Sequence, residues 1–171
     1  MNIHPVLVHF PIAMLTIYAI AELIRIKKIT DLPYWFYVKA CILFVGVGGA
    51  FISLSSGEGA EESVSRELRP LVEVHSTVAT ISTWIFVFLA LVYLIIWINK
   101  SSFNQKLVES KFAKLWSTLV NIANKIMGSY FMILVAFIGL ISITITGALG
   151  GAIVYGPDID PIVNFVYHIF M

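Results

Sequence analysis

Long apolar runs separated by short polar segments dominate the chain. Four of these runs are long enough to cross the hydrocarbon layer of a membrane, which takes about 20 helical residues. They cover residues 5–24, 37–54, 76–98 and 127–145, and the last can continue to residue 155. Because backbone polar groups in lipid must be satisfied within each segment, all four are predicted to be α-helices. The pattern therefore predicts an all-α protein, an integral membrane four-helix bundle.

Two further segments carry apolar residues without being able to cross. Residues 105–126 place apolar side chains at three- and four-residue steps, with lysines on the remaining arc. This predicts an additional interfacial amphipathic helix on the cytoplasmic side, or alternatively a docking site for a cytoplasmic partner. Residues 157–171 begin with a proline-containing turn, and we expect this tail to lie at the outer interface or to fold back over the bundle. The chain thus divides into a four-helix domain, 1–156, and an outer-face tail, 157–171.

The basic residues predict the orientation in the membrane. Nine of the eleven fall on one side of an up-down-up-down bundle: Arg25, Lys27, Lys28, Lys39, Lys100, Lys106, Lys111, Lys114 and Lys125. The opposite side holds only Arg66 and Arg69. Since positively charged loops face the cytoplasm, we expect both termini to lie outside a cytoplasmic (plasma) membrane.

Composition excludes several classes of protein. Hydrophobic residues make up 59% of the chain and charged residues 12%, and the mean hydropathy is +0.92, which is far too apolar for a soluble domain. A net charge of +1 gives no support to nucleic-acid binding. The single cysteine, Cys41, cannot form an internal disulfide or a cysteine-based metal cluster.

The histidines are the candidate functional residues. All four, His4, His9, His75 and His168, are predicted to lie on the outer side. Two imidazoles from different helices of a bundle can hold a haem iron from both sides. Because His9 and His75 enter the bundle at similar depth, we expect them to be the haem-iron ligands, with His4 and His168 as a second cofactor-binding pair if the tail folds back.

Other uses of these histidines stay open. Placing an imidazole at the membrane interface costs little free energy, so these histidines can lie there without a function. An outer-face zinc or copper site would combine His9 and His75 with Glu58, Glu61 or Glu62, although the spacing matches no compact metal motif. Glycines in the second and fourth helices leave room for a macrocycle, but small residues four apart are also common helix-packing devices in membranes.

Pro11 affects where His9 points, and it allows two interpretations. Within a helix, it clashes with the carbonyl of Leu7 and produces a kink that would turn His9 towards the bundle axis. Alternatively the helix starts late, and residues 4–9 form an extended lead-in.

The opening residues 4–13, HPVLVHFPIA, resemble the membrane proteins grouped as the domain of unknown function 2231 family. His75 at the start of the third helix and residues 150–156, GGAIVYG, strengthen the resemblance. It implies a four-helix membrane domain, sometimes fused to Rieske-type or cytochrome c modules, and hence a redox role with haem b. In the family a histidine commonly precedes the glycine at the end of this last motif, where this chain has Tyr155 before Gly156. A second haem would therefore need His168 as the replacement ligand.

The sequence thus predicts a membrane-embedded, haem b-binding electron-transfer subunit. It would act near the outer face and exchange electrons with a quinol pool or an external redox partner. The alternative is a non-catalytic accessory or scaffold subunit of a larger membrane complex. A stand-alone enzyme is not expected, because the chain has neither a serine nucleophile elbow nor a phosphate-binding glycine loop.

Overall fold

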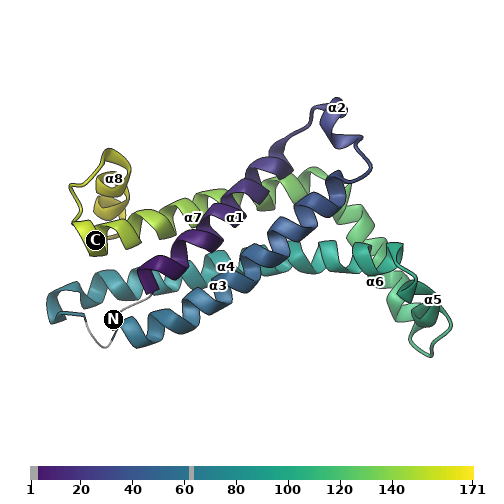
Figure 1. Ribbon diagram of the computed structural model, residues 1–171, viewed down its shortest axis with the longest axis horizontal. Coiled ribbons are helices and arrows are strands. Elements are labelled where there is room, and N and C mark those ends of the chain that lie inside the picture. Colours follow the sequence, from purple (N-terminus) through teal and green to yellow (C-terminus); the bar gives the residue numbers. More distant parts are fainter. Residues whose placement is uncertain (1–3, 62–63) are drawn as a thin grey trace.

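The computed structural model describes residues 4–61 and 64–171, and the described chain is almost entirely helical (Figure 1). The elements are α1 (His4–Leu23), α2 (Lys27–Thr30), α3 (Trp35–Glu61), the 3-10 helix η1 (Arg66–Leu68), α4 (Arg69–Lys100), α5 (Phe103–Val108), α6 (Ala113–Met127), α7 (Tyr130–Tyr155) and α8 (Pro161–Phe170). Four of them, α1, α3, α4 and α7, are long and apolar enough to cross a membrane. The predicted fold class, an all-α integral membrane bundle, is confirmed.

The four long helices form two pairs. Helix α1 makes its most extensive contacts with α3, and α4 makes its most extensive contacts with α7. Contacts of α3 with α4, and of α1 with α7, join the pairs into one bundle. In the core between the pairs, Leu15 and Tyr18 of α1 lie in one cluster with Phe86 and Leu89 of α4, and none of the four is exposed. We call α1 with α3 the first helix pair, and α4 with α7 the second.

The bundle has two chemically different ends. The starts of α1 and α4 and helix α8 lie at one end, which we call the histidine end (Figure 1). Helices α2, α5 and α6 lie at the other end, which we call the lysine end because Lys28, Lys106 and Lys114 are exposed there. The lysine end is the one that the distribution of basic residues predicts to face the cytoplasm.

This orientation can be tested by labelling from one side of the membrane. In a Cys41→Ser background, cysteine at Asp158, in the exposed turn between α7 and α8, should react with an impermeant maleimide added outside intact cells. Cysteine at Ser102, in the exposed turn before α5, should react only after the membrane is opened. The opposite pattern would place the histidine end in the cytoplasm.

Two long helices extend further at the histidine end than the apolar runs predicted. Helix α3 continues to Glu61. Its last residues are rich in glycine and glutamate, a composition that is more typical of a loop than of a helix. Ser56 in this extension donates a hydrogen bond to the Ser53 carbonyl, 2.9 Å away. Helix α4 begins at Arg69 instead of residue 76, with Pro70 in its first turn, where a proline is well accommodated.

The two amphipathic segments also differ in detail from the prediction. The tail helix α8 folds back on α7, one of its two expected positions, and its Val163 and Val166 lie in a cluster with Leu149 of α7. The expectation of one continuous helix over residues 105–126 is wrong, because the chain turns between α5 and α6. The Ser110 hydroxyl stabilises that turn by donating to the Leu107 carbonyl, 2.8 Å away.

Candidate functional site

Proline 11 connects the first turns of α1 to α3. Helix α1 begins at His4, so the alternative of an extended lead-in is wrong. Pro11 has no N–H to donate to the Leu7 carbonyl, one helical turn before it. The Ser53 hydroxyl of α3 instead donates a long hydrogen bond to this carbonyl, at 3.4 Å. The start of α1, which carries His4, is thereby held against α3.

His4 lies on the same part of α3. A Cβ atom built on Gly57 would be only 3.2 Å from Cε1 of His4, so glycine makes room for the imidazole there. Nδ1 of His4 is 2.8 Å from the Ser56 hydroxyl oxygen. The Ser56 hydroxyl also donates to the Ser53 carbonyl, so it links the imidazole of His4 to the backbone of α3.

Burial affects the charge of this imidazole. Removal from water lowers the pKa of His4, and the nearby Ser53 carbonyl opposes the shift only partly. The ring therefore remains neutral at lower pH than an exposed histidine does. A neutral ring is the form that can donate a lone pair to a metal ion.

His75 occupies the corresponding place in the second helix pair. Its Cε1 atom lies over Gly150 of α7, where an added Cβ would approach to 3.2 Å. Its Nδ1 atom is shielded from solvent and makes no hydrogen bond of good geometry to any described residue, although the Thr146 carbonyl lies nearby. Two turns further along α4, the Ser82 hydroxyl binds the Thr146 hydroxyl at 3.0 Å, which fixes α4 against α7. Each helix pair therefore presents one imidazole over a glycine of its own second helix.

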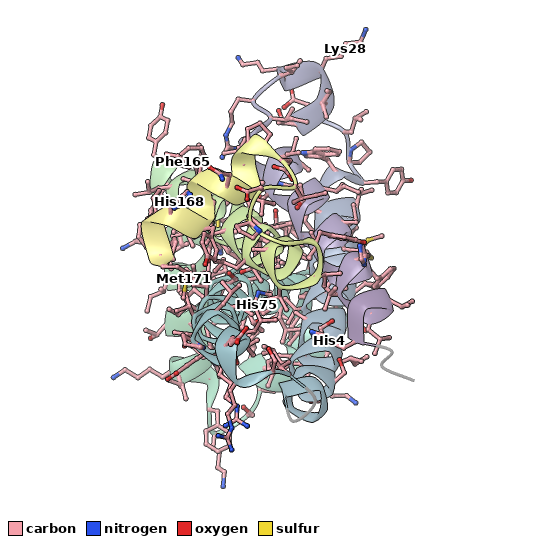
Figure 2. All side chains as sticks on the ribbon, turned by 90° about the vertical axis from the view of Figure 1, so that its left-hand side faces the viewer. His4, Lys28, His75, Phe165, His168 and Met171 are labelled. Carbon is pink, nitrogen blue, oxygen red and sulfur yellow. The ribbon has the colours of Figure 1, made fainter. Side chains whose placement is uncertain are left out.

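The structure brings His4, not His9, towards His75. His4 and His75 lie at the same end of the bundle (Figure 2). The side chain of His9 is exposed, so Pro11 does not turn it towards the bundle axis. His168 is exposed on α8, and Figure 2 shows it on the opposite side of the histidine end from His4. The expected second pair, His4 with His168, is not brought together.

A metal site built from histidines and glutamates finds no support among the described side chains. They contain no group of three or more His, Cys, Asp or Glu residues that could hold a metal ion. Glu62 lies outside the described residues, and the side chains of Glu58 and Glu61 are not described.

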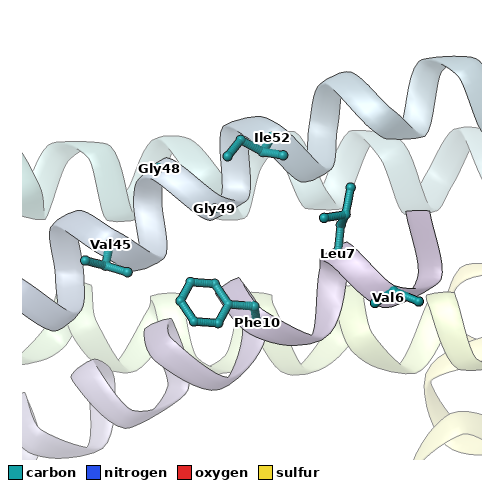
Figure 3. Close-up of a pocket in the computed structure, with 7 residues that line it drawn as sticks. All are labelled: Val6, Leu7, Phe10, Val45, Gly48, Gly49 and Ile52. Carbon is teal, nitrogen blue, oxygen red and sulfur yellow. The ribbon is translucent and has the colours of Figure 1, made fainter. Parts of the chain in front are cut away.

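An apolar pocket of about 420 Å³ lies between α1 and α3, close to the histidine end (Figure 3). Its lining residues are Val6, Leu7, Phe10, Val45, Gly48, Gly49 and Ile52. No histidine is among them, and a Cβ on Gly48 would meet nothing within 4 Å. The pocket lacks the polar groups that would fix the orientation of a ligand.

The sequence analysis missed a buried ionic cluster near the lysine end. Glu22 of α1 is 1% exposed, and its Oε2 atom accepts from Lys39 Nζ of α3 at 2.8 Å and from the Tyr93 hydroxyl of α4 at 2.6 Å. The Tyr18 hydroxyl is buried beside them and makes no hydrogen bond of good geometry within the described chain. One sequence signal was available: Glu22 is the only acidic residue among the first thirty. An acid in an apolar helix is costly unless a partner is near.

The comparison with protein families agrees with this architecture. The sequence model of the family described as "Predicted membrane protein (DUF2231)" matches residues 1–160. The chain belongs to this family. The DUF2231 match includes all four membrane-spanning helices, His4 and His75, whereas His168 lies beyond it. No curated protein and no solved structure matches the chain.

Proposed function

We propose that the chain holds one b-type haem at the histidine end, where His4 and His75 would bind the iron. It would act as an electron-transfer subunit that exchanges electrons there with a quinol pool or an external redox partner. The observation that carries the proposal is the placement of two imidazoles from separate helix pairs at the same end of the bundle, each lying over a glycine.

The chemistry of the two rings fits this use. The buried Nδ1 atom of His75 lacks a hydrogen bond to the described chain, which is costly for a polar group unless a further partner occupies the site. The hydrogen bond between Nδ1 of His4 and the Ser56 hydroxyl fixes the orientation of the imidazole ring. When bound, a haem with two imidazole ligands supplies a one-electron couple whose potential depends on its ligands and their surroundings.

The surrounding residues determine how firmly the imidazoles are placed. His4 is held against α3, because Ser53 and Ser56 bind the start of α1 and its histidine. His75 packs against α7, because Gly150 leaves room for its ring. Hydrogen bonding to the ring nitrogen opposite the metal raises the basicity of an imidazole ligand and fixes its plane.

The test is a visible spectrum of the purified full-length protein, prepared with haem supplied during expression. We expect a sharp Soret band, and an α-band on reduction. His4→Ala or His75→Ala should abolish the six-coordinate low-spin spectrum, because either change removes one axial ligand. His9→Ala and His168→Ala serve as matched controls and should retain it, since both side chains are exposed.

Each other result has a defined meaning. A colourless protein would contradict the proposal and favour the accessory or scaffold alternative. Loss of the spectrum in His9→Ala with retention in His4→Ala would return the assignment to His9 and His75. Stoichiometric zinc or copper in place of haem, lost in the same variants, would favour a metal site.

A further inference from the structure

Helix α6 has more apolar surface than the bundle covers. Trp116, Val120 and Ala123 are buried where α6 contacts α4 and α7. A second apolar stripe runs beside them and is exposed: Leu115 at 58%, Leu119 at 38% and Ile122 at 50%. The two stripes occupy one continuous arc of the helix, and Lys114, Asn121 and Lys125 lie on the opposite arc. Half of the apolar arc therefore still needs an apolar environment.

The charges around this helix have one sign. Residues 100–125 contain five lysines and one acidic residue, Glu109, which accepts a hydrogen bond from Gln105 at 3.0 Å. Two of the lysines lie beside exposed aromatic rings: Lys106 Nζ is 5.9 Å from the centre of the Phe103 ring, and Lys111 Nζ is 5.2 Å from that of Phe112. Aromatic rings and lysines that extend towards headgroups are both typical of the membrane interface.

The connection to α7 keeps α6 close to one end of a membrane-spanning helix. Only Gly128 and Ser129 separate the end of α6 from Tyr130, where the membrane-spanning helix α7 begins. Figure 1 shows α6 turning away from the direction of α7 at the lysine end. The Trp116 indole N–H donates to the Asn104 side chain at 2.8 Å, so α5 is held against α6. The exposed stripe and the lysines thus belong to one surface at the edge of the bilayer.

We infer that α5 and α6 form a binding surface for anionic phospholipids. The stripe of Leu115, Leu119 and Ile122 would lie among acyl chains at the membrane surface, and the lysines would bind lipid phosphates. Anionic lipids fit better than zwitterionic lipids because the surface carries an excess of positive charge with one nearby acid. An acidic protein partner would match the charge of the lysines, but it would not cover the apolar stripe with apolar groups.

The position of the stripe can be measured with spin labels on the full-length protein. In a Cys41→Ser background, one label replaces Leu119 on the stripe and a matched label replaces Asn121 on the polar arc of the same helix. The protein is reconstituted into vesicles of phosphatidylcholine and phosphatidylglycerol. We expect label 119 to collide with oxygen and not with a water-soluble nickel chelate, and label 121 to show the reverse. Access of nickel to both labels, or shielding of label 119 from both reagents by a protein neighbour, would overturn the inference.

The lipid preference needs a separate measurement. A fluorophore at position 119 is quenched by brominated phosphatidylglycerol or by brominated phosphatidylcholine at equal mole fraction. We expect several-fold stronger quenching by the anionic lipid at low salt, weakened by added salt. The triple variant Lys111→Gln, Lys114→Gln, Lys125→Gln should lose the preference while the label stays lipid-accessible. Equal quenching by the two lipids before any lysine is replaced would overturn the anionic preference.

Discussion

Replacing Lys39 by methionine should lower the free energy of unfolding by about 3 to 5 kcal/mol, because the change leaves the Glu22 carboxylate buried without its cation. Glu22 is 1% exposed, and its second oxygen, Oε1, is 3.9 Å from the half-exposed Arg25 guanidinium, a distance too long for a hydrogen bond. The measurement is the midpoint of unfolding in mixed micelles, followed by loss of helicity. Lys28→Met, which removes an exposed lysine at the same end, is the matched control and should change little.

Two further variants separate the ionic effect from lost packing. Glu22→Gln should cost less than Lys39→Met, since the long lysine side chain can reach towards the headgroups while a carboxylate in the last turn of α1 cannot. The double variant Glu22→Gln, Lys39→Met should recover much of the loss, because the glutamine oxygen can still accept from Tyr93 and no charge remains buried. If Lys39→Met were no worse than Lys28→Met, the cluster would not stabilise the bundle.

If the proposed function is right, replacing Gly150 by leucine should abolish haem binding; it should also destabilise the bundle by about 1 to 3 kcal/mol through overpacking. The Cβ atom alone would lie 3.2 Å from Cε1 of His75, and the rest of the leucine would force the ring out of place. Gly147→Leu is the control one turn away on the same helix, where an added Cβ meets nothing within 4 Å. That variant should keep the spectrum and lose no stability, since leucine favours a helix more than glycine does.

A double variant shows whether the imidazole is the group displaced. Adding His75→Ala to Gly150→Leu frees the space that the leucine needs, so stability should return although the haem cannot. Equal haem content in Gly150→Leu and Gly147→Leu would place the cofactor away from the glycine-backed imidazoles.

The membrane-spanning helices could be predicted because each contains a long apolar run. Their ends at the histidine end could not, because the extension of α3 contains Gly57 and Gly59, which alone disfavour a helix. What continues the helix there is a set of contacts made by Ser53 and Ser56 with the start of α1, and such contacts depend on how two helices align. The sequence does not show that alignment.

The sequence of α1 does not determine which of its two histidines faces the interior of the bundle. His4 and His9 lie about 140° apart around a helix, so only one of them can face the bundle interior. Which of the two faces inward depends on the rotation of α1 about its own axis. That rotation is determined by how α1 packs on α3, and the sequence of α1 alone does not show it.

The buried ionic cluster around Glu22 could not be predicted for a similar reason. In the sequence, Lys39 is one of several basic residues that are predicted to face the cytoplasm. Its pairing with Glu22 depends on the register of α1 against α3.

The division into two helix pairs has a thermodynamic consequence. His4 belongs to the first pair and His75 to the second, so a ligand that binds both rings also links the pairs. Its binding free energy then adds to the stability of the folded bundle, by about 2.7 kcal/mol at a free concentration one hundred times the Kd. The melting temperature of this protein should therefore rise with ligand concentration, and thermal shift in a panel of candidate ligands becomes a direct screen for what the histidine end binds.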